Sequence, residues 1–208
     1  MTSSAQPRLR ERLSHEDRRK QLIRIGLSML VQRPIHDLSL DAVAAEAGIS
    51  RGLLFHYFPT KSAYSSEVIA AAGRRVLRNV RPDDGATPVE AITQVVQRYV
   101  AQIDRRRESY AALVFGHSAE LGDTESPSDT LRKSLADMLI DAVGLPAQAF
   151  PVVHAWIAYV EDRALQWSAA PRAKRTEPVA DVVTDCVSAL DLLLSRDPDV
   201  AAHLHKEQ

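Results

Sequence analysis

The stretch from Ser39 to Lys61 restricts the fold of this chain more than any other, and it reads SLDAVAAEAGISRGLLFHYFPTK. Its first half has apolar residues at helical spacing, which predicts a short helix with one apolar face: Leu40, Val43, Ala44 and Ala47. Gly48 follows where this helix has to end, because glycine accepts the left-handed conformation that a sharp C-terminus needs. Ser50 is then a good N-cap for a second helix. The stretch therefore predicts two short helices joined by one tight turn.

The second of these helices has an outward face that is unusual for a surface in water. We expect Leu54, Tyr57 and Phe58 to pack back against the first helix. The outward side chains combine a cation, a glycine and exposed apolar or aromatic groups: Arg51, Gly52, Leu53, Phe55 and His56. Such a face suits a DNA groove better than solvent, so the pair is typical of a helix-turn-helix whose second helix enters the major groove. The alternative is an ordinary pair of packed helices.

The charge of the chain is divided between its two parts. Residues 1–80 contain 13 Lys and Arg and 7 Asp and Glu, a net charge of +6. Residues 81–208 contain 13 Lys and Arg and 20 Asp and Glu, a net charge of −7, and the whole chain has −1. A basic part joined to an acidic part indicates one module that binds a polyanion and one that does not.

The remaining composition favours a soluble, all-α protein. No apolar run approaches the roughly 20 residues that a membrane-spanning helix requires, and we expect no signal peptide. The single cysteine, Cys186, excludes an internal disulfide and fits a reducing cytoplasm. Because no convincing strand alternation occurs, we expect helices throughout.

A longer stretch, IHDLSLDAVAAEAGISRGLLFHYFPTKSAYSSEVI, closely resembles the DNA-binding domain of tetracycline-repressor-like (TetR) transcriptional regulators, over about residues 18–70. The resemblance includes the Ala-Gly-Ile-Ser turn, the Gly-Leu-Leu start of the second helix, and His-Tyr-Phe and Pro-Thr-Lys at the same spacing. It implies a three-helix helix-turn-helix domain over residues 18–64 and a helical ligand-binding and dimerisation domain over 65–208. The polar residues before them, with Arg8, Arg10 and Arg12, predict a flexible basic arm over residues 1–17.

The resemblance also implies which residues meet DNA. Ser39, Tyr57 and Lys61 would contact the phosphate backbone, and His56 could do so. Ser50, Arg51, Gly52 and Leu53 would lie at or near base edges. Phe55 stands where the family usually has tyrosine, so this position lacks one hydroxyl. Arg51 is the best candidate for direct readout, because a guanidinium can bond guanine at two points.

Caps and breakers predict the other helices. Their expected bounds are Ser14 to Arg33-Pro34, Lys61 to Val80, Thr87 to Arg105, residues 108–119, Ser128 or Asp129 to Gly144, Ala147 or Pro151 to Ser168, and Glu177 to Arg196 with Thr176 as cap. The last two have a long apolar seam that indicates a partner helix: Val153, Ile157, Val160, Ala164, Val179, Val183, Cys186, Leu190 and Leu193. We expect a homodimer through this seam; the alternative is that it packs only within its own subunit.

The second domain has residues that could line a cavity for a small, mostly apolar molecule: Tyr99, Tyr110, Phe115, His117, His154, Trp156 and Tyr159. We find no metal-ligand spacing, phosphate loop or nucleophile motif, so we expect no cofactor and no enzymatic activity. The function that fits best is a cytoplasmic repressor released from its operator by such a ligand. A regulator without an effector, an activator and, more remotely, an all-α enzyme remain alternatives.

Overall fold

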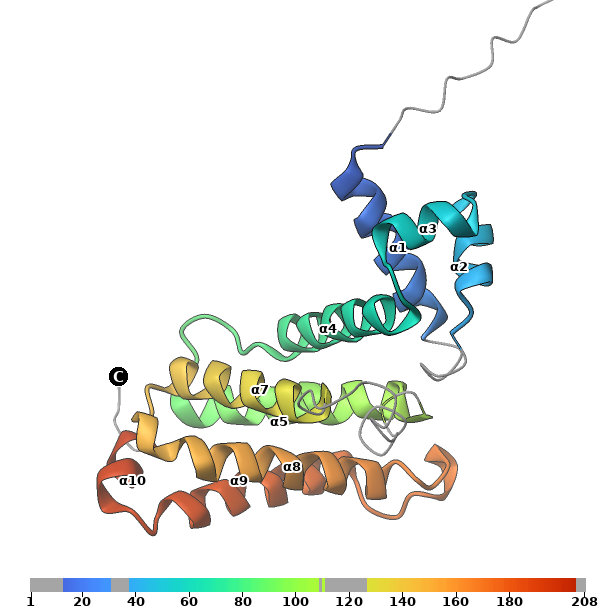
Figure 1. The fold of residues 1–208 in the computed structure, drawn as a ribbon. Helices are drawn as coiled ribbons and strands as arrows, with labels where there is room; N and C mark the ends of the chain where they lie inside the picture. Colours follow the sequence, from blue (N-terminus) through green and yellow to red (C-terminus); the bar gives the residue numbers. More distant parts are fainter. Residues whose placement is uncertain (1–12, 31–37, 109, 111–126, 205–208) are drawn as a thin grey trace, which may run out of the picture.

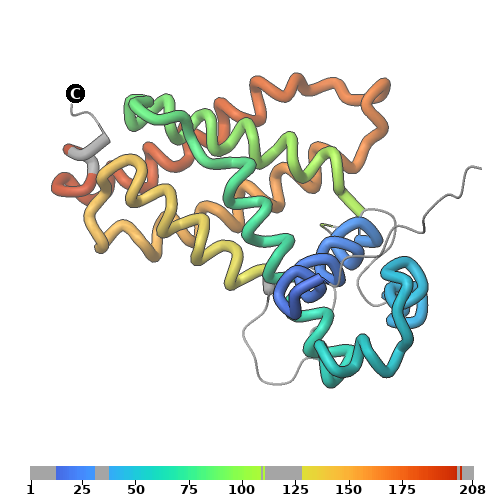
Figure 2. The backbone as a smooth tube through the Cα atoms, turned by 90° about the horizontal axis from the view of Figure 1, so that it is seen from above, coloured from blue at the N-terminus to red at the C-terminus, as the bar shows by residue number. Residues whose placement is uncertain are grey.

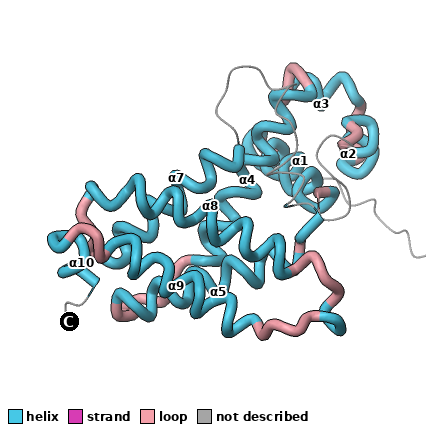
Figure 3. Tube along the Cα trace, turned by 90° about the horizontal axis from the view of Figure 1, so that it is seen from below, coloured by secondary structure: helices cyan, strands magenta, loops and turns pink. Residues whose placement is uncertain are grey.

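The protein is described by a computed structural model, which places residues 13–30, 38–108, 110 and 127–204. In these ranges all regular structure is helical, as expected (Figure 3). A small N-terminal group of helices lies at one end of a larger bundle, and α4 connects the two (Figure 1). Within the same ranges, no helix is long and apolar enough to cross a membrane.

The N-terminal group consists of α1 (His15–Met29), α2 (Leu40–Ala47), α3 (Arg51–Tyr57) and the first half of α4 (Lys61–Val80). Ser14 caps α1 as predicted, since its side chain accepts a hydrogen bond from the Asp17 amide. The predicted end at Arg33-Pro34 is wrong, because α1 ends at Met29, and Arg33 and Pro34 themselves lie outside the described residues.

The turn between α2 and α3 has the geometry that the sequence predicts. Gly48 has φ 64°, and its amide bonds the Ala45 carbonyl while the Ile49 amide bonds that of Ala44. This pair of bonds is the common left-handed ending of a helix, which glycine adopts without the steric cost of a Cβ atom. The turn fixes the angle at which α3 leaves α2.

A close contact between α1 and α4 holds the N-terminal group on the connecting helix. The Tyr64 hydroxyl donates to the Leu22 carbonyl at 2.7 Å, and burial raises the pKa of this phenol. A Cβ added at Gly26 would lie 2.5 Å from the Tyr64 hydroxyl oxygen and 2.6 Å from Cγ2 of Val68. Glycine is therefore required there for the two helices to approach.

The larger bundle contains α5 (Pro88–Arg105), α7 (Pro127–Val143), α8 (Phe150–Trp167), α9 (Val179–Leu194) and α10 (Pro198–Leu204), with 3-10 turns at Ala147–Ala149 and Arg172–Lys174. The view from above shows α4 crossing the bundle helices (Figure 2). Thr87 begins α5 with a full capping box, as predicted. The predicted helix at 108–119 lies almost entirely outside the described residues.

Two predicted boundaries are wrong. The first residue of α7 is Pro127, before Ser128 and Asp129. Thr176 does not cap α9, because that helix starts at Val179 after Pro178 and has no side-chain cap. The last long helix does stop before Pro198, as predicted, since α9 ends at Leu194. A further short helix, α10, was not predicted; it begins at Pro198, because proline suits the first position of a helix.

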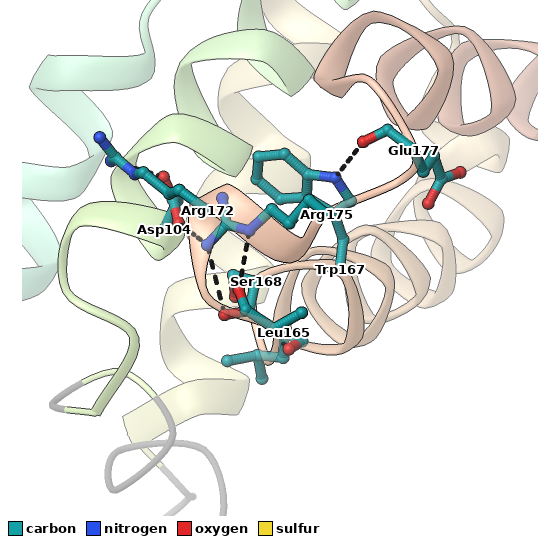
Figure 4. Close-up of polar contacts among 8 residues, drawn as sticks. Asp104, Leu165, Trp167, Ser168, Arg172, Arg175 and Glu177 are labelled. Atoms are coloured by element: carbon teal, nitrogen blue, oxygen red, sulfur yellow. Dashed lines mark hydrogen bonds and ion pairs between the residues drawn. The ribbon is translucent and has the colours of Figure 1, made fainter.

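A charged cluster holds the connection between α8 and α9 against the end of α5 (Figure 4). Asp104 accepts from Arg172 and from Arg175, each at 2.7 Å. The Arg175 guanidinium also lies 4.2 Å from the centre of the Trp167 ring, and the indole N–H of that residue donates to the Glu177 carbonyl at 2.9 Å. These contacts replace the cap predicted at Thr176, because they fix the residues that precede α9.

Candidate nucleic-acid interface

Two buried side chains hold α3 on the rest of the helix-turn-helix. Leu54 is fully buried and Phe58 is 1% exposed, as predicted for residues that pack back. Arg51, Gly52, Leu53 and His56 are exposed on the other side of α3, and Leu53 has 40% of its surface exposed. No described side chain buries these four residues in the single subunit. This face is therefore available for a partner.

Two predicted DNA contacts differ from the rest because they are half-buried. Phe55 packs against the core of the N-terminal group, so the expectation that it faces outward is only partly met. Tyr57 lies against His15 of α1, with ring centres 4.6 Å apart, and His56 is the next ring, 6.1 Å from His15. His15 was missed from the sequence, because nothing in its local pattern connects it with α3.

The N-terminal ends of α2 and α3 carry the two predicted serines. Ser39 caps α2 by accepting from the Ala42 amide at 3.3 Å, and Ser50 caps α3 by accepting from the Leu53 amide at 3.2 Å. Both are exposed, and accepting these bonds leaves each hydroxyl hydrogen to donate elsewhere. Lys61 is the exposed first residue of α4. All three are placed where helix N-termini attract anions.

Gly52 is not required by packing within the described part of the chain. A Cβ atom added there would meet only the Ser50 hydroxyl oxygen, at 4.0 Å. Its backbone is helical, without the positive φ that favours glycine. Glycine inside a helix costs about 0.5–1 kcal/mol relative to alanine, so contacts among the described residues do not explain its presence. Close approach of another molecule to α3 supplies one.

Comparison with known proteins agrees with this geometry. Residues 22–63 match the model described as "Bacterial regulatory proteins, tetR family", and residues 88–189 match that of the "Tetracyclin repressor-like, C-terminal domain". The chain belongs to the TetR family. It is therefore a DNA-binding transcriptional regulator, and regulators of this family act as dimers.

Solved structures extend the similarity over most of the chain. A TetR-family regulator from Streptomyces coelicolor is 26% identical with a TM-score of 0.72, covering 92% of this chain and 88% of that one. Salmonella enterica GusR has a TM-score of 0.62 over 88% of this chain and 98% of its own, and at 16% identity it shows the fold alone.

Curated relatives match shorter stretches. The uncharacterized regulator YxaF of Bacillus subtilis is 26% identical over 94 residues, which are 44% of this chain and 49% of YxaF. EthR of Mycobacterium tuberculosis is 40% identical over 52 residues, 25% of this chain and 24% of EthR. These matches span about half and about a quarter of the relatives' lengths.

The TetR C-terminal domain has a small apolar cavity between α5, α7 and α8. Its lining is Val95, Val96, Tyr99, Leu135, Trp156, Ile157 and Val160, and its volume of about 10 Å³ has room for about one water molecule. Of the predicted ligand residues that the structure describes, Tyr99 and Trp156 line it. The Trp156 indole also donates to the Cys186 carbonyl at 2.7 Å.

Two other predicted ligand residues, Tyr159 and His154, do not line this cavity. Tyr159 is 42% exposed, so its assignment to an interior cavity is wrong. His154 stacks on Phe150 and lies 3.2 Å from Asp129. Phe115 and His117 are outside the described residues. Within those residues no group of His, Cys, Asp and Glu is arranged to hold a metal ion.

A buried polar cluster next to the cavity was not expected from the sequence. The Glu161 carboxylate, 1% exposed, accepts from the hydroxyls of Tyr99 at 2.6 Å and Tyr110 at 2.7 Å, and from Nε of Arg132 at 2.5 Å. The two tyrosine hydroxyls also contact each other. Burial and then neighbouring charge raise the pKa of Tyr99, which keeps this phenol protonated. Periodicity could not bring Arg132 and Glu161 together, since they lie on different helices.

Most of the predicted dimer seam is wrong as an interface. Seven of its residues are at most 8% exposed in the single subunit and belong to its core: Val153, Ile157, Val160, Ala164, Val183, Cys186 and Leu190. Burial raises the pKa of the Cys186 thiol to about 11, in keeping with an inert packed residue. Only Val179 and Leu193, 41% and 40% exposed, remain free to meet a second copy.

Proposed function

We propose that this TetR-family regulator is a homodimeric repressor whose two α3 helices read a near-palindromic operator. Helix-turn-helix dimers place their reading helices in major grooves about 34–36 Å apart. The observation that carries the proposal is the face of Arg51, Gly52 and Leu53, exposed on a helix that Leu54 and Phe58 anchor. Arg51 has the donor geometry to read guanine, while Ser39, Lys61 and His56 would meet phosphates.

Dimerisation through α8 and α9 is supported mainly by residues outside the seam predicted from the sequence. Four large apolar side chains are exposed on α8 and α9: Tyr159, Val179, Leu192 and Leu193, with Leu192 at 69%. Exposed apolar groups of this size on adjacent helices favour burial against a partner. A second copy of α8 and α9 is the partner that fits a symmetric dimer. Sedimentation of wild type and Leu192→Glu tests this, with a shift toward monomer expected.

The effector that we propose is small and mostly apolar, because the residues that line the cavity are all aliphatic or aromatic. The present volume is far below the ~300–1,000 Å³ of typical ligand sites, so the surrounding side chains must move apart to admit it. A ligand can release DNA only by the difference between its affinities for the bound and free states. A regulator whose bundle only dimerises is the competing proposal, and the small cavity favours it.

The test begins with selection of bound sequences from random duplex DNA by the purified protein. Arg51→Ala should then reduce discrimination at one base position in each half-site by about 1–3 kcal/mol. Equal losses on the selected operator and on random DNA would remove Arg51 from base reading. Thermal shifts against a panel of apolar molecules separate the effector proposal from the dimerisation-only one. A reporter measured with and without the gene decides between repression and activation.

A further inference from the structure

An acidic side chain is in contact with the proposed base-reading arginine. Asp41 lies in the first turn of α2, beside the cap at Ser39. Its two carboxylate oxygens accept hydrogen bonds from Nη1 of Arg51, at 2.9 and 2.8 Å. Both side chains are largely exposed, 66% for Asp41 and 59% for Arg51. This pair therefore joins α2 to the start of α3 on the surface that faces DNA, where a carboxylate is repelled by phosphate.

The ring of Phe55 restricts the same guanidinium from a second direction. The Arg51 Cζ atom lies 5.4 Å from the centre of this ring, one turn further along α3. The carboxylate holds one nitrogen, and the ring covers part of the guanidinium. Two independent contacts thus define where an otherwise flexible side chain lies.

The contacts leave the donors that base reading needs. Both hydrogen bonds of Arg51 use Nη1, and within the described part of the chain Nε and Nη2 make none. A guanidinium has five N–H donors, and guanine accepts two of them at O6 and N7. The edge with Nε and Nη2 can therefore bond a guanine while Asp41 keeps its hold on Nη1.

We infer that Asp41 is a positioning residue that sets DNA specificity through Arg51. Ordering a long side chain on binding costs affinity, and a side chain ordered beforehand avoids part of that cost. On the operator, Arg51 reaches guanine already oriented. On random DNA, the same contact keeps Arg51 from turning to the nearest phosphate, and the carboxylate itself is repelled. The inference rests on the proposed function, because it requires Arg51 to meet a base.

The experiment measures the ratio of affinities for the selected operator and for random duplex, at one salt concentration. Asp41→Asn keeps the size of the side chain and removes the charge that holds Arg51. We expect the operator-to-random ratio to fall roughly three- to tenfold, with weaker operator binding. In an Arg51→Ala background the same change should leave the ratio unaltered. Thermal unfolding of each variant verifies that the exposed substitution leaves the fold intact.

Glu46→Gln is the matched control, since Glu46 is an exposed acid on the same helix with no contact to Arg51. It removes one negative charge and should leave the ratio unchanged. An unchanged ratio in Asp41→Asn, or an equal fall in the Arg51→Ala background, would overturn the inference while base reading by Arg51 stands. If Arg51→Ala itself leaves operator binding intact, the proposed role of Arg51 fails and the inference fails with it.

Discussion

Replacing Gly52 by alanine should strengthen the fold and weaken DNA binding at once. Among the described residues the atom nearest to the added Cβ lies at 4.0 Å, and the backbone is already helical. Alanine in a helix is about 0.5–1 kcal/mol more favourable than glycine. For a chain of this size that gain corresponds to a rise in Tm of about 1–4 °C.

The loss caused by Gly52→Ala should be a loss of DNA affinity, and it should not reduce the stability of the free protein. The new methyl group would stand on the face that we propose enters the groove, between Arg51 and Leu53. Displacing α3 weakens base contacts worth about 1–3 kcal/mol each, so operator affinity should fall at least about tenfold. Fluorescence anisotropy with the selected operator measures this, beside thermal unfolding without DNA.

Gly73→Ala gives the control. Gly73 is inside α4, and a Cβ there would lie 3.9 Å from Cδ1 of Leu131, an ordinary contact. This variant should gain similar stability and bind the operator as wild type does. If Gly52→Ala also binds like wild type, the argument that DNA requires a glycine at this position is refuted.

Three further predictions follow from the same structure. Lys61→Ala should weaken binding to all DNA and make the dependence of log K on log salt shallower by about one per lost phosphate contact, as titrations at several salt concentrations would show. Gly26→Ala should lower the free energy of unfolding in urea by about 1–3 kcal/mol, because the methyl group collides with Tyr64, and a stability equal to wild type would contradict the close α1–α4 contact. Burial alone would raise the pKa of Asp104, but hydrogen bonds and charges from Arg175 and Arg172 lower this pKa overall. Stability from this carboxylate is therefore present above its unfolded pKa of about 3.9 and lost as pH falls through the lower folded value, so the stability difference between wild type and Asp104→Asn should shrink in acid.

The sequence predicted the local features of the DNA-binding part well because local chemistry determines them. Gly48 ends α2 and Ser50 begins α3 through contacts within a few residues. Thr87 begins α5 for the same reason. The sequence does not show that Arg51 contacts Asp41, since that pair depends on the angle between two helices.

The bundle shows the limit of helical periodicity. A stripe such as Val153, Ile157 and Val160 indicates that one helix face is buried, but it does not say against what. The structure buries these residues within the subunit. Exposed positions outside the stripe, such as Leu192 and Tyr159, could be identified only once the neighbouring helices were placed.

Because α4 contributes residues to both hydrophobic cores, its movement couples them. Tyr64 and Val68 belong to the hydrophobic core around α1, α2 and α3, whereas Val76 and Val80 belong to that of the bundle. The two ends of this one helix are thus packed into two separate hydrophobic cores. At 1.5 Å per residue this 20-residue helix is about 30 Å long, so pivoting it by about 5° at the bundle end sweeps its far end through roughly 2.6 Å. A tilt of α4 therefore moves the N-terminal group of helices as one unit by about half the pitch of an α-helix, and no helix in that group has to bend.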